Sequence, residues 1–367
     1  MNLEEIRSLF PVTKEAIFLN NASQAPLNTL VHERLREYLK TELNPVGKKD
    51  FDRNTIRVLL AKLLGGTAEE YALITSTGVG MGIVSQGINF KKGDNVIIPE
   101  KEHMNNIFPW LQLEKKGVEV RFAKLNADNS FDPEAIEKLI DQNTRVVAMA
   151  AVRYNTGFRP NLSAIGKIAH EHGALFVVDA AQAAGMIPIN VEKDEIDVLT
   201  GCGFKWLLGM YGTGYLYVSK RVLKMIDSVL PGMFAAENHN DKLAYYDDSR
   251  KYETGTIAYS LFTAWTAGLE LVLKVGVETI YERALENTDL LIDGLKEKGY
   301  HLVSPTKKRE EKTAIVHFNT GVFDTTKALH KKLTDNKVLT TLQVENIRVS
   351  PNFFNTKEEI KMFLDLV

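Results

Sequence analysis

The stretch from about residue 55 to 220 alternates short β-branched runs with longer helical patterns, and this alternation limits what the chain can fold into. Short apolar runs predict strands at residues 71–75, 95–99, 119–124, 144–150, 174–180, 198–200 and 214–218. Helical patterns lie between them, at residues 80–87, 103–116, 133–142 and 162–172. Such alternation predicts a mostly parallel sheet with helices on both faces. Runs such as ALFVVDA are apolar throughout, as a buried parallel strand requires.

From residue 259 to 299 the pattern changes to that of long helices, with Gly276 as a break or kink. Further strands are expected at residues 313–318, 338–343 and 347–350, and they alternate with helices at residues 325–335 and 356–366. We therefore expect a large domain at residues 16–255 and a smaller α+β domain at residues 256–367. The N-terminal residues 1–15 are expected to pack on the small domain.

Composition excludes several classes of protein. The 367 residues include 45 basic and 47 acidic side chains, and a net charge of −2 argues against nucleic-acid binding. Apolar runs are shorter than the roughly 20 residues of a membrane helix, and the N-terminus lacks the apolar core of a secretory signal. Cys202 is the single cysteine, so an internal disulfide and a cysteine-only metal cage are excluded. We expect a soluble, cytoplasmic protein without a metal, membrane or nucleic-acid partner.

An apolar strand that ends in Asp179 offers the first candidate for chemistry. Ligands of open parallel sheets bind beyond the carboxyl ends of the strands, so Asp179 is expected to point into a site, with Gln182 on the following turn. A carboxylate there could pair with a protonated heterocyclic nitrogen, a metal ion or a ribose. It could equally cap the next helix without touching a ligand.

Lys205 follows the next predicted strand, among glycines and aromatic residues. Partial burial lowers the pKa of a lysine and leaves a neutral amine suited to Schiff-base chemistry. Alternatively, its stem packs on Trp206 while its ammonium group reaches water, and this segment by itself favours that interpretation.

Residues 74–80 lead from a strand through a small-residue turn into a helix. Backbone N–H groups at such a helix start bind phosphate, helped by a hydroxyl such as that of Thr77. The spacing of Gly78, Gly80 and Gly82 also approaches a dinucleotide fingerprint, although the fingerprint needs a glycine where Ile83 stands. A non-catalytic nucleotide-binding α/β protein is therefore an alternative.

Other polar residues carry weaker signals. His103 opens a helical pattern, and Asn155 follows the predicted strand at residues 144–150. Arg348 lies inside an apolar strand, where an arginine usually needs an anionic partner.

Taken in order, these segments resemble the class V aminotransferases, fold-type I enzymes that use pyridoxal 5'-phosphate. The resemblance spans nearly the whole chain, through residues 18–23, 102–106, 179–182, 203–205, 252–256 and 347–356. It implies a three-layer α/β fold with a mainly parallel sheet and a smaller C-terminal α+β domain. It also implies pyridoxal 5'-phosphate as the cofactor.

The resemblance assigns catalytic roles to three residues. Lys205 would form the Schiff base with the cofactor and move the α-proton of the substrate. Asp179 would bind the pyridinium nitrogen and keep it protonated, which preserves the electron sink. His103 would stack on the face of the cofactor ring.

It also implies how the cofactor and substrate are held. Gln182 would bond the phenolic oxygen of the ring, and Asn155 would lie at that oxygen and at the substrate carboxylate. The phosphate would be held by Thr77, Gly78 and Cys202.

The remaining implied contacts involve the substrate and a second subunit. Arg348 would clamp the α-carboxylate through a bidentate pair, and Asn21 and Ala22 would line the substrate site. Thr256 matches the position that reaches the phosphate of a partner subunit, so a homodimer is expected.

Departures from the family pattern bear on the reaction. Phe204 stands where a histidine often precedes the lysine, and Cys202 stands where a serine is frequent. Desulfurases carry a catalytic cysteine on a loop shortly before the carboxylate-binding arginine, whereas residues 338–346 contain none. This argues against a reaction that forms a persulfide on the enzyme.

The expected function is that of a pyridoxal-phosphate enzyme acting on an L-amino acid. Transamination, with a keto acid as second substrate, is the main hypothesis, and a carbon–sulfur lyase, desulfurase-like or epimerase activity is the alternative. A nucleotide-binding protein without activity would leave Lys205 and Arg348 unexplained. Residues 233–246 are expected to shape the substrate entrance or a dimer contact.

Overall fold

A seven-stranded sheet forms the centre of the large domain, in the order β2-β8-β7-β6-β5-β3-β4. The computed structural model describes residues 1–47, 51–239 and 242–367. All neighbouring strands of this sheet run parallel except for the two pairs that involve β8, which is antiparallel to both β2 and β7. The strands are β2 (Tyr71–Ile74), β3 (Asn95–Pro99), β4 (Glu119–Ala123), β5 (Thr144–Ala150), β6 (Leu175–Asp179), β7 (Val198–Cys202) and β8 (Gly214–Val218).

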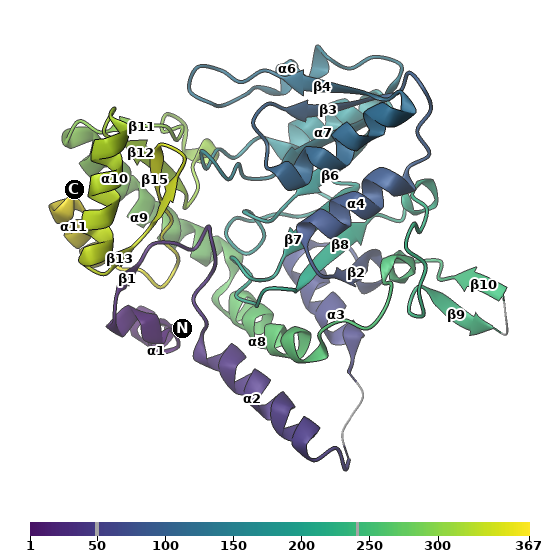
Figure 1. Cartoon of the computed structure of the whole chain (residues 1–367), viewed down its shortest axis with the longest axis horizontal. Coiled ribbons are helices and arrows are strands. Elements are labelled where there is room, and N and C mark those ends of the chain that lie inside the picture. The colour runs from purple at the N-terminus through teal and green to yellow at the C-terminus, as the bar shows by residue number, and fades with distance from the viewer. Residues whose placement is uncertain (48–50, 240–241) are drawn as a thin grey trace.

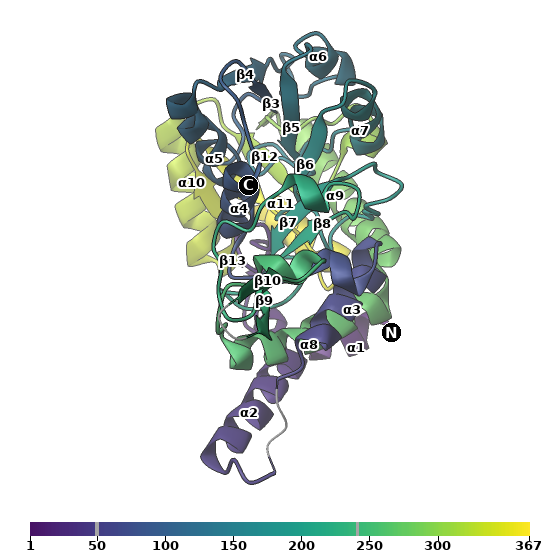
Figure 2. The same cartoon turned by 90° about the vertical axis from the view of Figure 1, so that its right-hand side faces the viewer.

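Helices cover both faces of this sheet, because its strands are apolar on both sides (Figures 1 and 2). Along β6 the side chains alternate: Phe176 and Val178 join the core beneath α3, α7 and α8, whereas Val177 joins the core beneath α4 and α5. The helices of this domain are α2 (Thr29–Leu43), α3 (Arg53–Leu64), α4 (Thr77–Gly87), α5 (Phe108–Leu111), α6 (Pro133–Glu137), α7 (Leu162–Glu171) and α8 (Tyr259–Val275).

The small domain is a four-stranded antiparallel sheet packed against helices. A short parallel pair, β1 with β13, joins the N-terminal segment to it. Its strands are β11 (His301–Leu302), β12 (Val316–Asn319), β14 (Thr341–Gln343) and β15 (Asn346–Val349), and the short pair is β1 (Ile17–Phe18) with β13 (Val338–Leu339). Its helices are α9 (Val277–Glu297), α10 (Phe323–Asp335) and α11 (Lys357–Leu366).

The N-terminal helix α1 (Leu3–Ser8) lies against the small domain (Figure 1). Arg7 forms an ion pair of 2.9 Å with Glu359 of α11, and the ring of Phe10 stacks on Phe354 at 4.3 Å. Helix α8 packs against the large sheet through Trp265, so the large core includes residues beyond 255. The domain boundary expected at residue 255 stays a prediction.

Some expected elements differ from the observed ones. Residues 103–116, expected as one helix, form α5 between two 3-10 turns, because Pro109 lacks the N–H that a continuous helix needs. The expected strand at residues 338–343 is broken at Thr340, where the chain passes from the pair with β1 to the pair with β15. Helices α2 and α3 were not predicted. Only Val31 of α2 is buried, so this helix has no long apolar stripe in the sequence.

The segment at residues 233–246 contains a hairpin, β9 (Ala236–His239) with β10 (Lys242–Tyr245), that projects from the large domain (Figure 1). Met233 and Leu243 are largely exposed at this hairpin. The role expected for the segment, in the entrance or a dimer contact, stays a prediction.

No single helix within the described residues is long and apolar enough to cross a membrane. Helices α8 and α9 would reach the needed length and apolar content only as a pair, and they are bent by 77° at Gly276. Within the same residues no cluster of three or more histidine, cysteine or acidic side chains has a geometry that could hold a metal ion.

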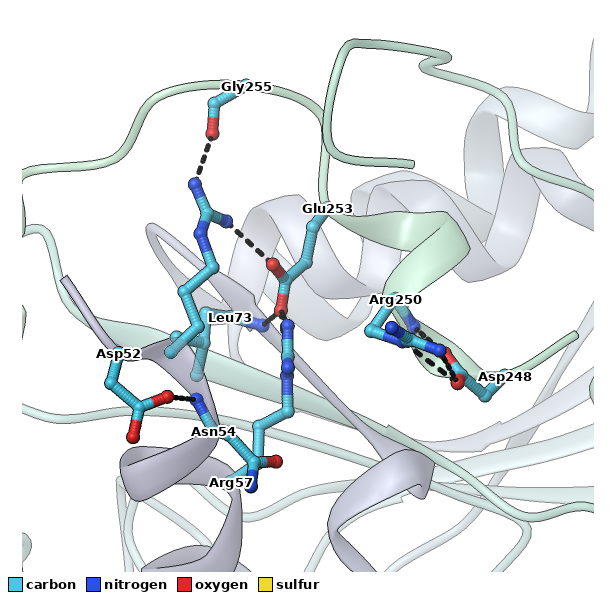
Figure 3. A network of polar contacts seen from close by, with 9 residues as sticks. Asp52, Asn54, Arg57, Leu73, Asp248, Arg250, Glu253 and Gly255 are labelled. Carbon is cyan, nitrogen blue, oxygen red and sulfur yellow. Dashed lines mark hydrogen bonds and ion pairs between the residues drawn. The ribbon is translucent and has the colours of Figure 1, made fainter. Parts of the chain in front are cut away.

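A buried ion network fixes the loop that follows the hairpin (Figure 3). Glu253 accepts bonds from Arg53 and Arg57 of α3, both at 2.6 Å, and from the backbone N–H of Leu73 at 2.9 Å. Arg53 also donates to the carbonyl of Gly255 at 3.1 Å. Thr256 is therefore attached to a firmly held backbone.

Candidate active site

A cavity lies at the carboxyl ends of the parallel strands, the place where ligands of such sheets bind. Its empty volume is about 590 Å³, and part of it is open to solvent. Its wall is made by Ser76, Thr77, His103, Asn105, Ala150, Val152, Tyr154, Asp179, Ala181, Gln182, Cys202, Phe204 and Lys205. These residues follow β2, β3, β5, β6 and β7, so strands distant in sequence converge on one site.

Asp179 ends β6 and lies at the base of the cavity, 5% exposed. Burial raises the pKa of its carboxyl group, while a hydrogen bond of 2.8 Å from the N–H of Ala181 and the nearby charges of Lys205 and His103 oppose that rise. The second carboxylate oxygen has no bond to a described protein group. Asp179 is thus an acceptor that faces the cavity as well as a cap for the following turn.

Lys205 reaches the same cavity from the segment after β7. Burial lowers the pKa of its amine, the charge of Arg348 lowers it further, and Cys202 and Asp179 act in the opposite direction. Its Nζ lies 5.6 Å from the centroid of the Phe204 ring and has no hydrogen-bond partner among the described residues. A partly desolvated amine without a fixed partner is suited to attack a carbonyl and to exchange protons.

The N-terminus of α4 points backbone N–H groups at the cavity. Ser76 caps the helix by accepting from the N–H of Val79 at 3.3 Å, and Thr77 is the first helical residue. The side chain of Thr77 bonds that of Cys202, whose pKa burial raises to about 11. A helix start with two hydroxyls and a neutral thiol can hold a phosphate group. Gly78 does not line the cavity, but a Cβ there would lie 3.3 Å from Asn105.

Gln182 connects the cavity to the N-terminal segment. Its Nε2 donates to the carbonyl of Ala22 at 2.8 Å, and its Oε1 accepts from the indole of Trp206 at 2.9 Å. The backbone N–H of Ala22 in turn binds the hydroxyl of Ser350, and Asn21 donates to the carbonyl of Ser350 at 2.8 Å. Asn21 and Ala22 therefore lie behind Gln182 and do not line the cavity.

His103 faces the cavity beside Tyr154, with its ring edge-on at 5.0 Å between centroids. Its Nδ1 accepts from the N–H of Asn105 at 3.1 Å, and burial lowers the pKa of its imidazole. Beneath it, Glu102 forms a buried ion pair of 3.1 Å with Arg153. Burial raises the pKa of Glu102 to about 7, although Arg153 opposes this rise.

Arg348 lies on β15 of the small domain, opposite His317 of β12. It is 6% exposed, and among the described residues its guanidinium group has neither a hydrogen bond nor an ion pair. Burial lowers its pKa to about 10, so it keeps its charge at neutral pH. The facing His317 stays neutral, because burial and Arg348 lower its pKa to about 3. A buried cation without a partner is a binding place for an anion.

Arg348 and two other predicted site residues, Asn155 and Thr256, lie outside the cavity wall. Asn155 donates to the carbonyl of Lys101 at 3.1 Å, while its Oδ1 is buried without a partner. Thr256 does not reach the cavity of its own chain. Its predicted role, at the phosphate of a partner subunit, stays a prediction.

Sequence reasoning assigned no role to Ser76, Asn105 or Tyr154, all of which line the cavity. Ser76 and Asn105 lie beside predicted site residues, so their position in the same turns was a usable signal. Tyr154 precedes Asn155, but nothing in its sequence neighbourhood shows which of the two faces the cavity.

The fold and the cavity are those of a pyridoxal-phosphate enzyme of fold type I, and comparison with known proteins gives the family. The profile described as "Aminotransferase class-V" matches residues 17–363. The chain belongs to this family, whose cofactor is pyridoxal 5'-phosphate.

Individual relatives carry several names. The chain is 30% identical over 311 residues to a probable cysteine desulfurase of Methanothermobacter thermautotrophicus, which covers 81% of this chain and 78% of the relative. It is 27% identical to the uncharacterized aminotransferase YcbU of Bacillus subtilis, over 99% of this chain and 96% of that relative.

Solved structures share the fold. The apo cysteine desulfurase of Thermococcus onnurineus NA1 superposes with a TM-score of 0.90 at 24% identity, over 99% of this chain and 96% of the other. The cystine C-S lyase C-DES, in complex with cysteine persulfide, superposes with a TM-score of 0.88 at 22% identity, over 97% of this chain and 98% of the other.

The residues present fit the cofactor. A pyridine ring that carries a phosphate needs an acceptor for its ring nitrogen, an amine for its aldehyde and an anion site for its phosphate. The free oxygen of Asp179, the unpartnered amine of Lys205 and the start of α4 supply these three groups around one cavity.

Proposed function

We propose that the protein is a carbon–sulfur lyase that acts on a sulfur-containing L-amino acid and releases the sulfur product directly. The sequence by itself favours transamination, but relatives named as cysteine desulfurases support chemistry at a carbon–sulfur bond. The observation that carries the proposal is the state of the chain's single cysteine. Cys202 is buried against Thr77 at the start of α4, and its raised pKa of about 11 keeps it a neutral thiol.

A thiol in that state is a poor nucleophile, because the thiolate is the reactive form. The segment before Arg348 also contains no cysteine. Only Val344 and Glu345 join β14 to β15, so no long loop is present there to carry one. The chain therefore has no side chain suited to take sulfur from a substrate. Departure of the sulfur group as a free product requires no such acceptor.

The proposed roles of the residues follow from their positions. Bound pyridoxal phosphate supplies the electron sink that stabilises the negative charge left when the α-proton of the amino acid is removed. Asp179 holds a proton on the ring nitrogen, and the neutral amine of Lys205 takes the α-proton. Arg348 binds the α-carboxylate and so holds the amino acid in a fixed orientation at the site.

Elimination then breaks the Cβ–S bond, and the sulfur leaves with the bonding electrons and takes up a proton. The three-carbon fragment takes up water and yields pyruvate and ammonia. L-cysteine would give sulfide as the third product, and L-cystine would give cysteine persulfide.

Product analysis tests this proposal. The protein loaded with pyridoxal phosphate is incubated with L-cysteine or L-cystine, and pyruvate, L-alanine and sulfur products are measured, with Lys205→Ala as the control. We expect pyruvate in equal amount to the sulfur product. L-alanine in place of pyruvate would show sulfur transfer to a thiol, and amino transfer that depends on a keto acid would show an aminotransferase.

A further inference from the structure

Tyr154 lines the cavity beside His103, on a loop that contacts the small domain. Its phenolic oxygen has no hydrogen-bond partner among the described residues, and polar side chains such as His103 and Asn105 line the same cavity. A cavity-facing hydroxyl without a partner is free to bond a ligand.

The backbone around Tyr154 is held from several directions. Nε2 of His317, on the small domain, donates to the carbonyl of Tyr154 at 3.2 Å. Because its pKa is lowered to about 3, His317 is neutral, and this bond places its one ring proton on Nε2. On either side, Arg153 is fixed by its ion pair with Glu102, and Asn155 by its bond to Lys101. The backbone of Tyr154 is therefore fixed, and this limits the positions that its side chain can take.

The loop that carries Tyr154 also faces Arg348. His317 and Arg348 are paired directly across β12 and β15, so their side chains lie on the same face of the small sheet, and the ring of His317 reaches the carbonyl of Tyr154. Tyr154 also opposes the lowering of the Arg348 pKa by burial, which agrees with this placement. The phenol and the guanidinium group can both donate hydrogen bonds. Nε of Arg348 is buried without a partner, and no bond from the Tyr154 hydroxyl to a described residue is found. Two free donors on facing segments, one of them cationic, suit the two oxygens of a carboxylate.

We propose that Tyr154 is a substrate-binding residue whose hydroxyl donates a hydrogen bond to the α-carboxylate that Arg348 also binds. The inference deepens the proposed function and rests on it only for the amino-acid class of the substrate. His317 is the positioning residue that fixes the loop carrying Tyr154.

The test compares two ligands that differ only by the carboxylate. Wild-type protein and Tyr154→Phe, both loaded with pyridoxal phosphate, are titrated with glycine and with methylamine, and binding is followed by the change in visible absorbance. Glycine has no leaving group, so the titration measures binding without elimination. We expect Tyr154→Phe to weaken glycine binding about tenfold, the value of one hydrogen bond to a charged group, and to leave methylamine binding within about twofold.

Tyr300→Phe is the matched control, because its ring packs on Phe318 in the small domain, 5.2 Å between centroids, away from the cavity. It should change neither titration. The inference is overturned if Tyr154→Phe binds glycine as the wild type does. It is also overturned if the variant weakens both ligands equally, since the side chain would then act only as a wall of the cavity.

The two proposals can fail separately. Selective loss of glycine binding, in a protein that releases no pyruvate from any sulfur amino acid, would reject the lyase reaction and support Tyr154 as a carboxylate donor. Pyruvate release by a Tyr154→Phe variant with unchanged glycine affinity would support the lyase reaction and reject Tyr154 as a carboxylate donor.

Discussion

Two buried groups of charges in this molecule differ in how completely they are paired. At the loop after the hairpin, Glu253 is 1% exposed, and its oxygens accept from Arg53, Arg57 and the N–H of Leu73 (Figure 3). At the candidate site, Lys205 lines the cavity and is partly buried, and Arg348 of the small domain is 6% exposed, yet neither has a hydrogen-bond or ion-pair partner among the described residues.

The difference has an energetic meaning. Burying a charge costs several kcal/mol unless hydrogen bonds and an opposite charge compensate it. In the Glu253 network, ion pairs and hydrogen bonds within the chain compensate this cost, and they fix the loop at residues 253–256. The basic groups of Lys205 and Arg348 are not compensated by the chain itself. Unpaired basic side chains are therefore the feature that separates the ligand site from a structural ion network, although both are polar and shielded from solvent.

The largest effect is expected at Lys205, where removal of the amine would break the site and leave the fold intact. Lys205→Ala should lower turnover by at least about a thousandfold, because it removes both the covalent attachment and the base. The free energy of unfolding should not fall, since Lys205 makes no bond to the chain. Turnover by steady-state assay and unfolding in urea, measured side by side, check the two parts. Loss of stability together with turnover would contradict this separation.

Glu253 should show the opposite pattern. Glu253→Ala leaves Arg53 and Arg57 largely buried without their carboxylate partner, so the free energy of unfolding should fall by about 3–5 kcal/mol. The matched control is Glu33→Ala, which breaks an exposed pair with Arg36 and should cost at most about 1 kcal/mol. Urea unfolding curves of the two variants measure these changes. Equal losses in the free energy of unfolding would show that pairing in the Glu253 network does not stabilise the fold.

Arg348 should separate stability from binding. Arg348→Met removes an unpaired buried cation, so stability should stay within about 1 kcal/mol of the wild type or rise. Glycine binding by the loaded protein should weaken about a hundredfold, because a bidentate charged pair is lost. If the variant were strongly destabilised, Arg348 would have a structural partner and its assignment to the substrate would be wrong.

The smallest effect concerns Glu102, which is paired but sits beside the cavity. Its pKa is raised by burial to about 7, above its ordinary value of 4.5. Between these values the folded protein holds a proton that the unfolded chain has lost, so this group lowers stability as the pH rises from about 5 to 7. Glu102→Gln has no such titration and should lessen that fall by about 2 kcal/mol, measured by urea unfolding at pH 5 and pH 8. An unchanged pH dependence would place the pKa of Glu102 near its ordinary value.

Patterns within one element were enough to predict much of this architecture. Strands such as β6 are recognisable because every residue is apolar up to Asp179, and the position of that carboxylate follows from the rule for parallel sheets. Lys205 became a candidate through its unusual neighbours, Phe204 and Trp206, and through the family resemblance. The family and the cofactor were thereby anticipated.

Features that depend on contacts between distant segments were not predictable in the same way. The pair of Glu102 with Arg153 joins the ends of two strands, and nothing in either segment indicates the other. Tyr154 was missed for the same reason, because its proposed role depends on Arg348 and His317 of the small domain. Helix α2 was missed because it buries little of its surface.

The most direct test of the account is the visible absorbance spectrum after addition of pyridoxal phosphate to the wild type and to Lys205→Ala, Arg348→Met and Glu33→Ala. The unpaired side chains of Lys205 and Arg348 are predicted to bind the cofactor and the substrate, respectively. The wild type, Arg348→Met and Glu33→Ala should then gain a visible band that Lys205→Ala lacks. At moderate concentration, glycine should alter this band in the wild type and in Glu33→Ala but not in Arg348→Met. A wild-type protein that remains colourless, or a Lys205→Ala variant that gains the same band, would contradict the account.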